Sequence, residues 1–307
     1  MQIIDRMEQF NINEETAVAI GKFDGIHLGH QALLQEILSA KEDGLKSVIF
    51  TFHPSPAAVF GGYEEKVLTT SEEKREYFHK AGVDYLVEYP MNRQTASVEP
   101  IDYIKKYLVE RMHAKLIVAG PDLSYGKQGQ GDFALLERYG SKYCYTARQI
   151  EKICADGGEI SSTRVRNALK QGNMREVTLC LGSFYSLDGI VRHGNEVGRM
   201  LGFPTLNLVP DREKLLPPFG VYYSLVTLGE KQYHGVTNIG RKPTVHAGDE
   251  VTVETNLFQF DDTAYGQRIR VELMEFVRPE RRFENRQQLM EQIHKDVEQA
   301  EIFFSKT

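Results

Sequence analysis

The stretch Gly21–His30, GKFDGIHLGH, decides the fold of the first half of the chain. It follows the apolar run Ala17–Gly21, which predicts a short buried strand. It precedes Gln31–Ala40, whose leucines and isoleucine recur at helical spacing. A strand, a glycine-rich turn and a helix in this order are typical of an α/β sheet, in which ligands bind beyond the carboxyl ends of the strands. The turn is therefore a candidate ligand site.

The turn has the composition of a phosphate site. Its glycines let the backbone approach a ligand closely, and the N-terminus of the following helix offers free N–H groups to an anion. His27 and His30 can donate hydrogen bonds to a phosphoryl group as its charge grows in a transition state. Metal binding and plain packing are the alternatives, but no cysteine or carboxylate pattern nearby completes a metal site. The other candidate ligand-binding residues of the turn are Gly21, Phe23, Asp24 and Gly25.

The rest of the first half continues the alternation of strands and helices. Ser47–Phe52, Val83–Tyr89 and Lys115–Gly120 predict buried strands. Pro100–Met112 predicts a helix with proline in its first turn. Together these segments predict a parallel sheet that is covered on both faces.

A second phosphate-type motif is Ile160–Arg166, ISSTRVR. Ser162 and Thr163 stand at a predicted helix start and Arg164 follows, so hydroxyls, backbone N–H groups and a guanidinium can surround a polyphosphate. Taken alone, the same residues could serve only as a helix cap. The stretch Gly120–Lys127 is not a P-loop, because it has one residue too many between its glycines and Gln128 follows the lysine.

The second half of the chain shows a different pattern of predicted strands and turns. Strand-like runs separated by turn residues predict an antiparallel barrel or sandwich, and a helix from about Glu284 to Phe304, with Asn285 as its N-cap, closes the chain. The rhythm changes near Leu181–Tyr185, which predicts domains of residues 1–182 and 183–307. The predicted strands are Gly220–Leu228, Gln232–Ile239, Thr252–Phe260 and Ile269–Val277.

The densest motif of this half lies between Gly194 and Asn207. Thr205 and Asn207 alternate along a strand, so both can face one ligand, and their oxygens are hard ligands suited to Mg²⁺. Glu254, on a later strand, can accept a proton from a substrate hydroxyl. A glycine- and proline-rich hairpin with a surface threonine is the alternative. Further candidate nucleotide-binding residues of the motif are Gly194, Gly198, Arg199 and Pro204.

Composition limits the function classes. The formal net charge of −6 argues against a nucleic-acid partner, and no apolar run approaches the ~18 residues of a membrane span. The three cysteines form no Cys-x-x-Cys pair, and Met1–Phe10 lacks the pattern of a signal peptide. We therefore expect a cytoplasmic protein with neither nucleic-acid nor membrane partners; oligomeric state is not predicted from the sequence.

The motifs together resemble the HxGH nucleotidyltransferase superfamily and, more closely, the prokaryotic bifunctional riboflavin kinase/FAD synthetases. The chain departs from the family pattern at Asn256, where histidine is frequent, at Ser183-Phe184, and at Leu123-Ser124. Further stretches in the family's order are Thr51–Pro56, Leu68–Lys74, Gly120–Lys127, Asp188–Val191, Pro217–Tyr222, Asn238–Thr244, Tyr265–Gly266 and Phe276–Glu280.

The resemblance implies a Rossmann-like nucleotidyltransferase domain followed by an antiparallel β-barrel riboflavin kinase domain with a closing helix. It implies that riboflavin is phosphorylated by ATP to FMN and that FMN is adenylylated by ATP to FAD, with Mg²⁺ at both steps. Narrower alternatives are that one half alone is active, or that the chain is a flavin-binding protein without catalysis.

The resemblance also implies residue roles. His27 and His30 contact the ATP phosphates, Asp24 shapes their turn and the metal environment, and Asp122 orients the flavin or nucleotide. Ser162, Thr163 and Arg164 hold the leaving pyrophosphate. In the kinase half, Glu254 is the general base, Thr205 and Asn207 bind Mg²⁺ and phosphates, and the loop with Gly194, Gly198 and Arg199 covers the nucleotide.

Overall fold

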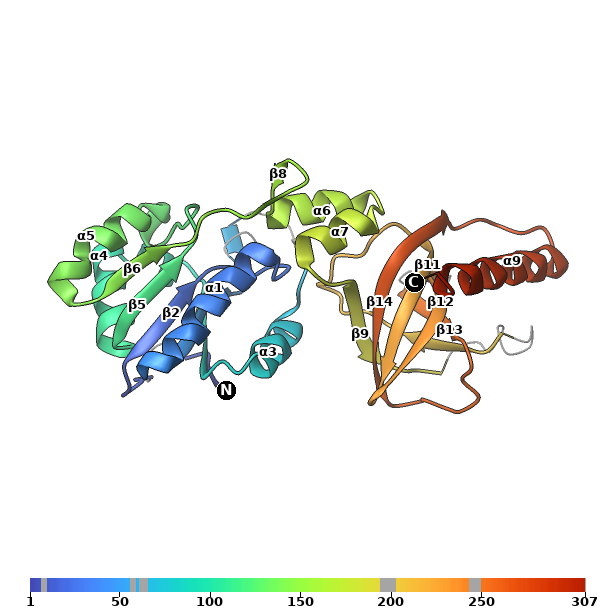
Figure 1. Ribbon diagram of the computed structural model, residues 1–307, viewed down its shortest axis with the longest axis horizontal. Helices are drawn as coiled ribbons and strands as arrows, with labels where there is room; N and C mark the ends of the chain where they lie inside the picture. Colours follow the sequence, from blue (N-terminus) through green and yellow to red (C-terminus); the bar gives the residue numbers. More distant parts are fainter. Residues whose placement is uncertain (7–9, 56–58, 61–65, 194–202, 243–249, 307) are drawn as a thin grey trace. The chain divides into compact units, whose positions relative to one another are not determined.

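The computed structural model describes residues 1–307 except 7–9, 56–58, 61–65, 194–202, 243–249 and 307. The chain divides into two compact units, Met1–Ser162 and Thr163–Thr307 (Figure 1). The secondary structure of the two units agrees with the change of pattern in the sequence, because the first unit is α/β and the second is built around an antiparallel sheet.

The first unit contains a six-stranded parallel sheet in the order β1-β4-β3-β2-β5-β6. From β2 the chain winds to β3 and β4 on one side and to β5 and β6 on the other. The winding direction thus reverses at β2, where parallel sheets place their ligand crevice. The strands are β1 (Gln2–Ile4), β4 (Tyr85–Pro90), β3 (Lys46–His53), β2 (Thr16–Ile20), β5 (Ala114–Ala119) and β6 (Thr146–Gln149).

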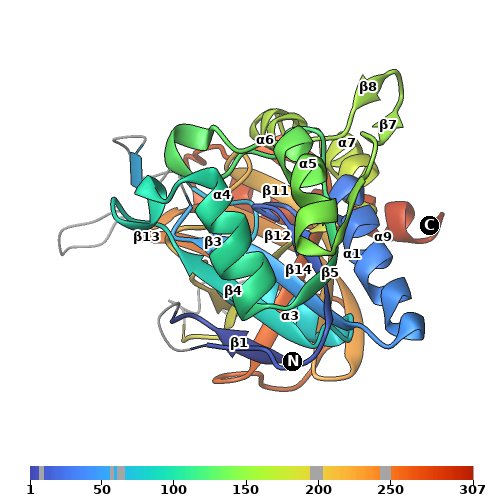
Figure 2. The same ribbon diagram turned by 90° about the vertical axis from the view of Figure 1, so that its left-hand side faces the viewer.

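Helices cover both faces of this sheet (Figures 1 and 2). Strand β2 is buried along its whole length, with Ala17 and Ala19 packed on one face and Val18 and Ile20 on the other. The first face is covered by α1 (Leu28–Ser39) and α3 (Ser71–Lys80), and the second by α4 (Pro100–Tyr103), η3 (Ile104–Arg111) and α5 (Phe133–Tyr143). Shorter elements are η1 (Ala40–Asp43), η2 (Thr95–Ser97), η4 (Lys127–Gly129), β7 (Cys154–Ala155) and β8 (Gly158–Glu159).

The second unit contains a six-stranded antiparallel sheet in the order β10-β13-β12-β11-β14-β9. Arg192 follows β9, and its antiparallel bridge to Asn207 of β10 brings the two end strands of the sheet together, which gives the sheet a barrel form. The strands are β9 (Tyr185–Ile190), β10 (Thr205–Leu208), β11 (Gly220–Leu228), β12 (Lys231–Lys242), β13 (Glu250–Leu257) and β14 (Arg268–Pro279).

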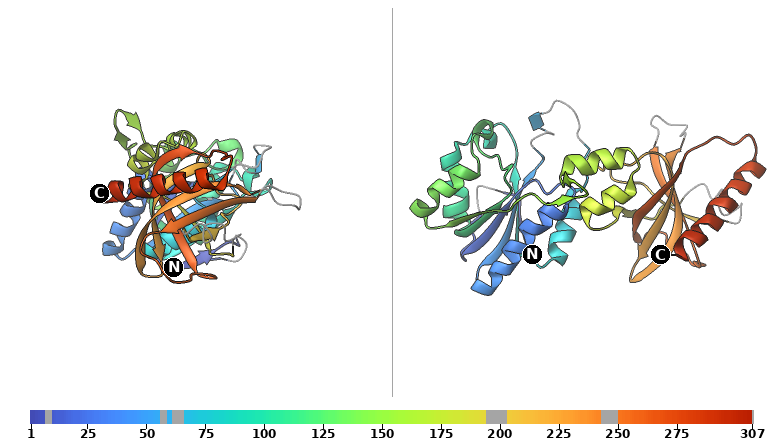
Figure 3. Two further views of the ribbon diagram at one scale, coloured as in Figure 1. Left: turned by 90° about the vertical axis from the view of Figure 1, so that its right-hand side faces the viewer. Right: turned by 45° about the horizontal axis from the view of Figure 1, so that its top comes forward.

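Among the described residues of this unit, three helices accompany the sheet. Helix α6 (Ser162–Lys170) starts at the last residue of the first unit, α7 (Met174–Leu181) packs against β9 and β14, and α9 (Arg286–Phe304) runs along the sheet (Figure 3). Helix α9 begins as predicted, because the Asn285 side chain accepts a hydrogen bond from the backbone N–H of Gln288.

The predicted fold class is confirmed in both halves. The predicted helix Pro100–Met112 differs in detail, since an α-helical turn passes into a π-helix at Ile104. The division between the units falls at Ser162/Thr163, and α6 and α7 group with the second unit. The domain boundary at 182/183 stays a prediction.

Candidate active sites

The turn after β2 is tightly folded. Phe23, Gly25 and Ile26 all have positive φ, at 49°, 90° and 46°, a region that residues with a Cβ rarely adopt. Such a backbone persists only where surrounding contacts hold it. The turn follows β2, so it stands at the carboxyl end of the strand at which the sheet's winding reverses.

Asp24 supplies the main anchor of this turn. Its Oδ1 accepts hydrogen bonds from the backbone N–H groups of Leu68 (2.8 Å) and Thr69 (3.2 Å). The Gly25 N–H donates to Thr69 Oγ1 at 3.0 Å, and the Ser162 hydroxyl donates to the Asp24 carbonyl at 2.7 Å. Asp24 therefore joins the turn to the segment before α3 and to the first residue of α6.

The two predicted histidines lie against each other. His27 is the N-cap residue of α1, and its ring stacks on that of His30 with centroids 3.8 Å apart. Both Nδ1 atoms are buried and have no hydrogen-bond partner among the described residues. Gly29 permits the arrangement, because a Cβ there would lie 3.1 Å from Cε1 of His27. Buried ring nitrogens without protein partners are suited to bind a polar ligand.

Burial keeps both imidazoles neutral. It lowers the pKa of His27 to about 4, although the Asp24 carboxylate partly opposes this shift. The pKa of His30 lies well below its ordinary value because of burial and, next, the neighbouring His27 and Lys74. At neutral pH the pair therefore offers N–H donors to a phosphate but no positive charge.

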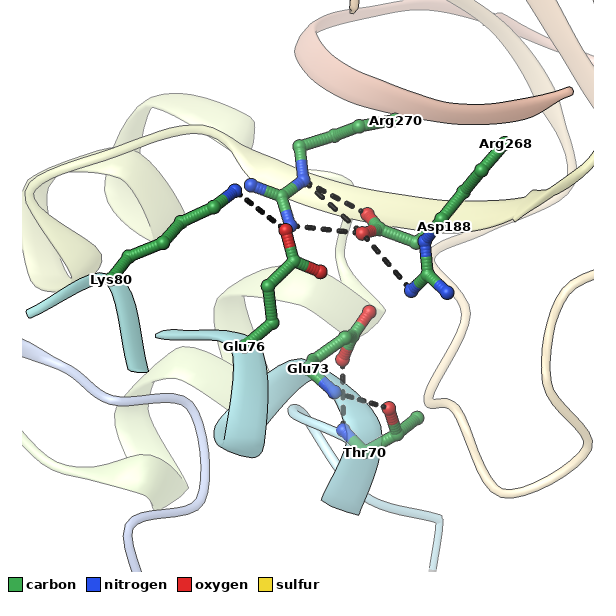
Figure 4. A network of polar contacts seen from close by, with 7 residues as sticks. All are labelled: Thr70, Glu73, Glu76, Lys80, Asp188, Arg268 and Arg270. Carbon is green, nitrogen blue, oxygen red and sulfur yellow. Dashed lines mark hydrogen bonds and ion pairs between the residues drawn. The ribbon is translucent and has the colours of Figure 1, made fainter. Parts of the chain in front are cut away.

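Lys74, on α3, brings a cation to the same turn. Its Nζ donates to the carbonyl of Lys22 at 3.0 Å, and burial lowers its pKa, with Asp24 and Glu88 opposing that shift. The helix that carries it begins with a capping box, in which the side chains of Thr70 and Glu73 each accept a hydrogen bond from the other's backbone N–H (Figure 4). The sequence gives no separate role to Lys74, which is the last residue of the Leu68–Lys74 stretch.

The other predicted residues of this half occupy varied surroundings. Asp122 follows β5 and is exposed, and its carboxylate pairs with Lys152 at 3.0 Å. Thr163 is exposed at the start of α6. Arg164, in the second unit, pairs through its Nε with Glu176 of α7 at 2.5 Å. Gly21 continues the sheet, because its N–H donates to the carbonyl of Phe50.

In the second unit, strand pairing aligns the predicted kinase residues. Asn207 of β10 lies opposite Glu254 of β13, and Glu254 lies opposite Asn238 of β12. Val221 of β11 is the next partner, followed by Arg278 of β14. This row therefore joins residues from five strands on one face of the sheet.

A cavity of about 320 Å³ opens on that face. Thr205, Glu254 and Asn238 contribute polar groups to its wall, while Val221 and Val236 provide apolar surface. Further lining residues come from the segment before β10, from β13, from the end of β14 and the residues after it, and from helix α9: Phe203, Asn256, Arg278, Glu280, Arg281, Phe283, Leu289, Ile293, Asp296 and Val297.

Hydrogen bonds order the polar wall of the cavity. The Asn207 amide donates to the carbonyl and hydroxyl oxygens of Thr205 at 3.3 and 3.4 Å. The Asn256 amide donates to the Pro204 carbonyl at 2.8 Å, so the residue that departs from the family pattern holds the start of β10. The predicted Gly194, Gly198 and Arg199 lie outside the described residues.

Ion pairs fix the elements around the cavity. Arg278 of β14 forms a forked contact with the buried Asp296 of α9, at 2.6 Å for Nη2, and Gln292 also donates to that carboxylate. Between the neighbouring strands β9 and β14, the Asp188 carboxylate accepts hydrogen bonds from Arg270 and forms an ion pair with Arg268 (Figure 4). The first of these contacts holds α9 against the cavity.

On the opposite face of the same strands, three buried hydroxyls form a chain. Ser224, Thr237 and Thr255 lie on β11, β12 and β13, with Oγ distances of 2.7 and 2.8 Å. All three residues are buried. Because side chains alternate along a strand, this packed face supports the row that contains Asn207, Glu254 and Asn238.

Among the described residues, no group of three or more histidine, cysteine, aspartate or glutamate side chains is arranged to hold a metal ion. Within the same residues, no helix combines the length and apolar character needed to cross a membrane.

The fold and the two sites define an enzyme class that joins a Rossmann-like nucleotidyltransferase unit to a barrel kinase unit. Family models agree with this division: that of FAD synthetase matches residues 9–164, and that of riboflavin kinase matches residues 181–304. The chain belongs to the bifunctional riboflavin kinase/FMN adenylyltransferase family. It phosphorylates riboflavin to FMN and adenylylates FMN to FAD.

Curated relatives extend over the whole chain. The bifunctional riboflavin kinase/FMN adenylyltransferase of Bacillus subtilis (strain 168) is 36% identical over 304 residues, covering 96% of this chain and 95% of the relative. The Escherichia coli (strain K12) enzyme of the same name is also 36% identical, covering 96% of this chain and 94% of its own. A solved structure described as a macrolide-efflux protein from Streptococcus pneumoniae is 30% identical, with a TM-score of 0.87 over 97% of this chain and 98% of its own.

Proposed function

We propose that FMN is made in the cavity of the second unit and FAD at the Gly21–His30 turn of the first. The observation that carries the kinase assignment is the row Asn207–Glu254–Asn238, with Glu254 on the cavity wall. For the transferase, it is the pair of buried imidazoles at the start of α1.

In the kinase site, Glu254 accepts the proton of the terminal riboflavin hydroxyl as its oxygen attacks the γ-phosphorus of ATP. The oxygen–phosphorus bond forms, the bond to the β-phosphate bridging oxygen breaks, and ADP leaves with the electron pair. The apolar side chains of Val221, Val236 and Ile293 give the flavin ring a surface to pack on. Riboflavin thereby presents its hydroxyl toward the polar wall.

Thr205 and Asn207 would hold Mg²⁺ at this site. The donor set suits the ion, because a hydroxyl and an amide on the same strand offer hard oxygen atoms. When bound, Mg²⁺ offsets the charge of the ATP phosphates. Asn207 keeps the Thr205 hydroxyl oriented through the hydrogen bonds between the two side chains.

In the transferase site, a phosphate oxygen of FMN attacks the α-phosphorus of ATP, and pyrophosphate leaves. Neutral His27 and His30 donate hydrogen bonds to the phosphoryl oxygens as charge builds. Asp24 holds the turn in register, Ser162, Thr163 and Arg164 bind the pyrophosphate, and Asp122 orients the flavin or nucleotide. Phe23, whose ring lies 5.1 Å from that of His30, packs behind the pair.

The proposal extends to cell location and partners. We infer a cytoplasmic enzyme whose partners are the small molecules ATP, riboflavin and FMN, without a nucleic acid or a membrane. The net charge of −6 supports the absence of a nucleic-acid partner. We also propose that residues 183–307 hold every group needed by the kinase.

Chromatographic product analysis tests the whole assignment. The purified chain is given riboflavin or FMN with ATP, with and without Mg²⁺. We expect FMN and then FAD from riboflavin, and FAD from FMN, with both reactions dependent on Mg²⁺. FMN as the only product would remove the transferase role from the first unit, and no turnover would leave a flavin-binding protein.

A further inference from the structure

The two histidines of the transferase site carry no positive charge at neutral pH. Adenylyl transfer concentrates negative charge on the α-phosphoryl oxygens and on the leaving pyrophosphate. Both imidazoles are neutral at neutral pH because burial lowers the pKa of each. Hydrogen-bond donors without charge stabilise an anion less than charged donors do.

Lys74 is a cation that the structure holds against the histidine turn. It belongs to α3, and the residues just before that helix, Leu68 and Thr69, donate to the Asp24 carboxylate of the histidine turn. Its Nζ reaches back to the carbonyl of Lys22 in the same turn. Three contacts thus fix the lysine-bearing helix to the turn.

The ammonium group retains capacity for a ligand. It has three N–H donors, and the described residues show one hydrogen bond for it, to Lys22. The nearby Glu88 is already engaged by the guanidinium of Arg75, with Nε at 2.9 Å. The Asp24 carboxylate is held by backbone N–H groups. This partly buried cation is close enough to His30 for its charge to lower the pKa of that imidazole, and the Nδ1 atoms of His30 and of the stacked His27 have no partner among the described residues.

We propose that Lys74 binds the transferred phosphoryl group of ATP and supplies the positive charge that the two histidines do not. The inference rests on the proposed location of FAD synthesis and adds a phosphate-binding residue to it. The FMN oxygen forms the new bond to the α-phosphorus, the bond to the pyrophosphate oxygen breaks, and its electron pair leaves with pyrophosphate. Lys74 keeps its proton throughout and acts by charge and hydrogen bonding.

Three variants separate charge from structure. Lys74→Gln keeps a donor for the Lys22 carbonyl but removes the charge, Lys74→Arg keeps the charge, and Lys80→Gln alters an exposed lysine on the same helix. We expect Lys74→Gln to lower kcat for FAD formation by ~10²-fold, the usual loss for one transition-state donor. Lys74→Arg should regain part of that loss, and Lys80→Gln should match the wild type.

The readouts are kcat and KM for FAD formation from FMN, riboflavin phosphorylation as a control for the fold, and the melting temperature. Near-normal kcat in Lys74→Gln would overturn the proposal and reduce the residue to a tether for Lys22. So would equal loss in all Lys74 variants accompanied by a lower melting temperature. FAD formation that survives His30→Ala would instead mean that the transferase site itself is misplaced.

Discussion

Asn207 on β10 and Glu254 on β13 are direct cross-strand partners. Directly opposed residues of an antiparallel pair have Cα atoms ~4.5–5.5 Å apart, so their side chains stand together on one face. A slip of one residue between these strands would turn Glu254 into the packed interior. The register of this one pair therefore brings the proposed magnesium ligand and general base to the same substrate.

Glu254→Gln should nearly eliminate FMN formation while FAD formation from supplied FMN stays near normal. Glutamine keeps the size of the side chain but cannot accept the proton of the substrate hydroxyl. Loss of a general base lowers the rate by ~10²–10⁴. The measurement is the initial rate of each reaction, with FMN and FAD separated by chromatography.

Glu275→Gln provides the matched control, because Glu275 is exposed on β14 of the same sheet. It should leave both rates unchanged. Kinase activity within a few-fold of wild type in Glu254→Gln, at an unchanged melting temperature, would mean that another group takes the proton.

His30→Ala should abolish FAD formation and spare FMN formation. The imidazole is buried at the start of α1, against His27, and removing one transition-state donor typically costs ~10²–10³ in rate. His79→Ala, an exposed histidine on α3, is the control. If both activities of His30→Ala fell together in a folded protein, the assignment of two separate sites would be wrong.

The His27 imidazole should stay neutral at pH values at which an ordinary histidine is already protonated. Because burial lowers its folded-state pKa from 6.5 to about 4, the unfolded chain binds the proton more readily than the folded one between these values. Stability is therefore unaffected above pH 6.5 and falls as the pH drops toward 4. At pH 5 the loss from this residue is about 2 kcal/mol.

Two measurements check this prediction. The His27 ring resonance in NMR should remain that of a neutral imidazole down to about pH 5. The drop in melting temperature between pH 7 and pH 5 should be smaller in His27→Gln than in wild type, and unchanged in His79→Gln. A His27 titration midpoint near 6.5 would contradict the burial described here.

The fragment of residues 183–307 should fold and phosphorylate riboflavin, yet be less stable than residues 163–307. Helix α7 buries Met174, Val177 and Leu181 and packs on β9 and β14. Each such side chain contributes about 1.5–3 kcal/mol when fully buried, so removal of the helix should lower the melting temperature by roughly 10–20 °C or more.

Parallel melting curves and FMN assays of the two fragments decide the point. Equal stability would favour the boundary at 182/183 without qualification. An unfolded shorter fragment would move the boundary to the start of α6, and a folded but inactive one would show that residues before 183 contribute to the kinase site.

Much of the fold follows from local sequence. The alternation of buried strands with helices indicates the parallel sheet, and Asn285 followed by Gln288 marks the start of α9 correctly. The π-helix at Ile104–Arg111 was not predictable, because its residues show ordinary helical periodicity. Helix–sheet packing rather than local propensity determines such details.

The candidate sites contain features that the local sequence does not determine. Motif spacing selected His27, His30, Thr205, Asn207 and Glu254, whose types already indicate phosphate chemistry. The stacking and burial of the histidines depend on how α1 meets its turn, which spacing alone does not give. Lys74 ends the Leu68–Lys74 stretch, but its contact with the histidine turn depends on how α3 meets that turn. Asn238 enters the kinase row through the pairing of distant strands.

The two faces of strand β13 carry residues with different roles. Glu254 and Asn256 face the cavity, while Val253 and Thr255 are buried on the other side, where Thr255 completes the chain of hydroxyls. Under the proposed assignment of the cavity to riboflavin, replacements at Val236 should alter which flavin analogue is accepted without disturbing the barrel interior. The alternation of the strand gives this enzyme a route by which substrate preference diverges among descendants while the scaffold stays the same.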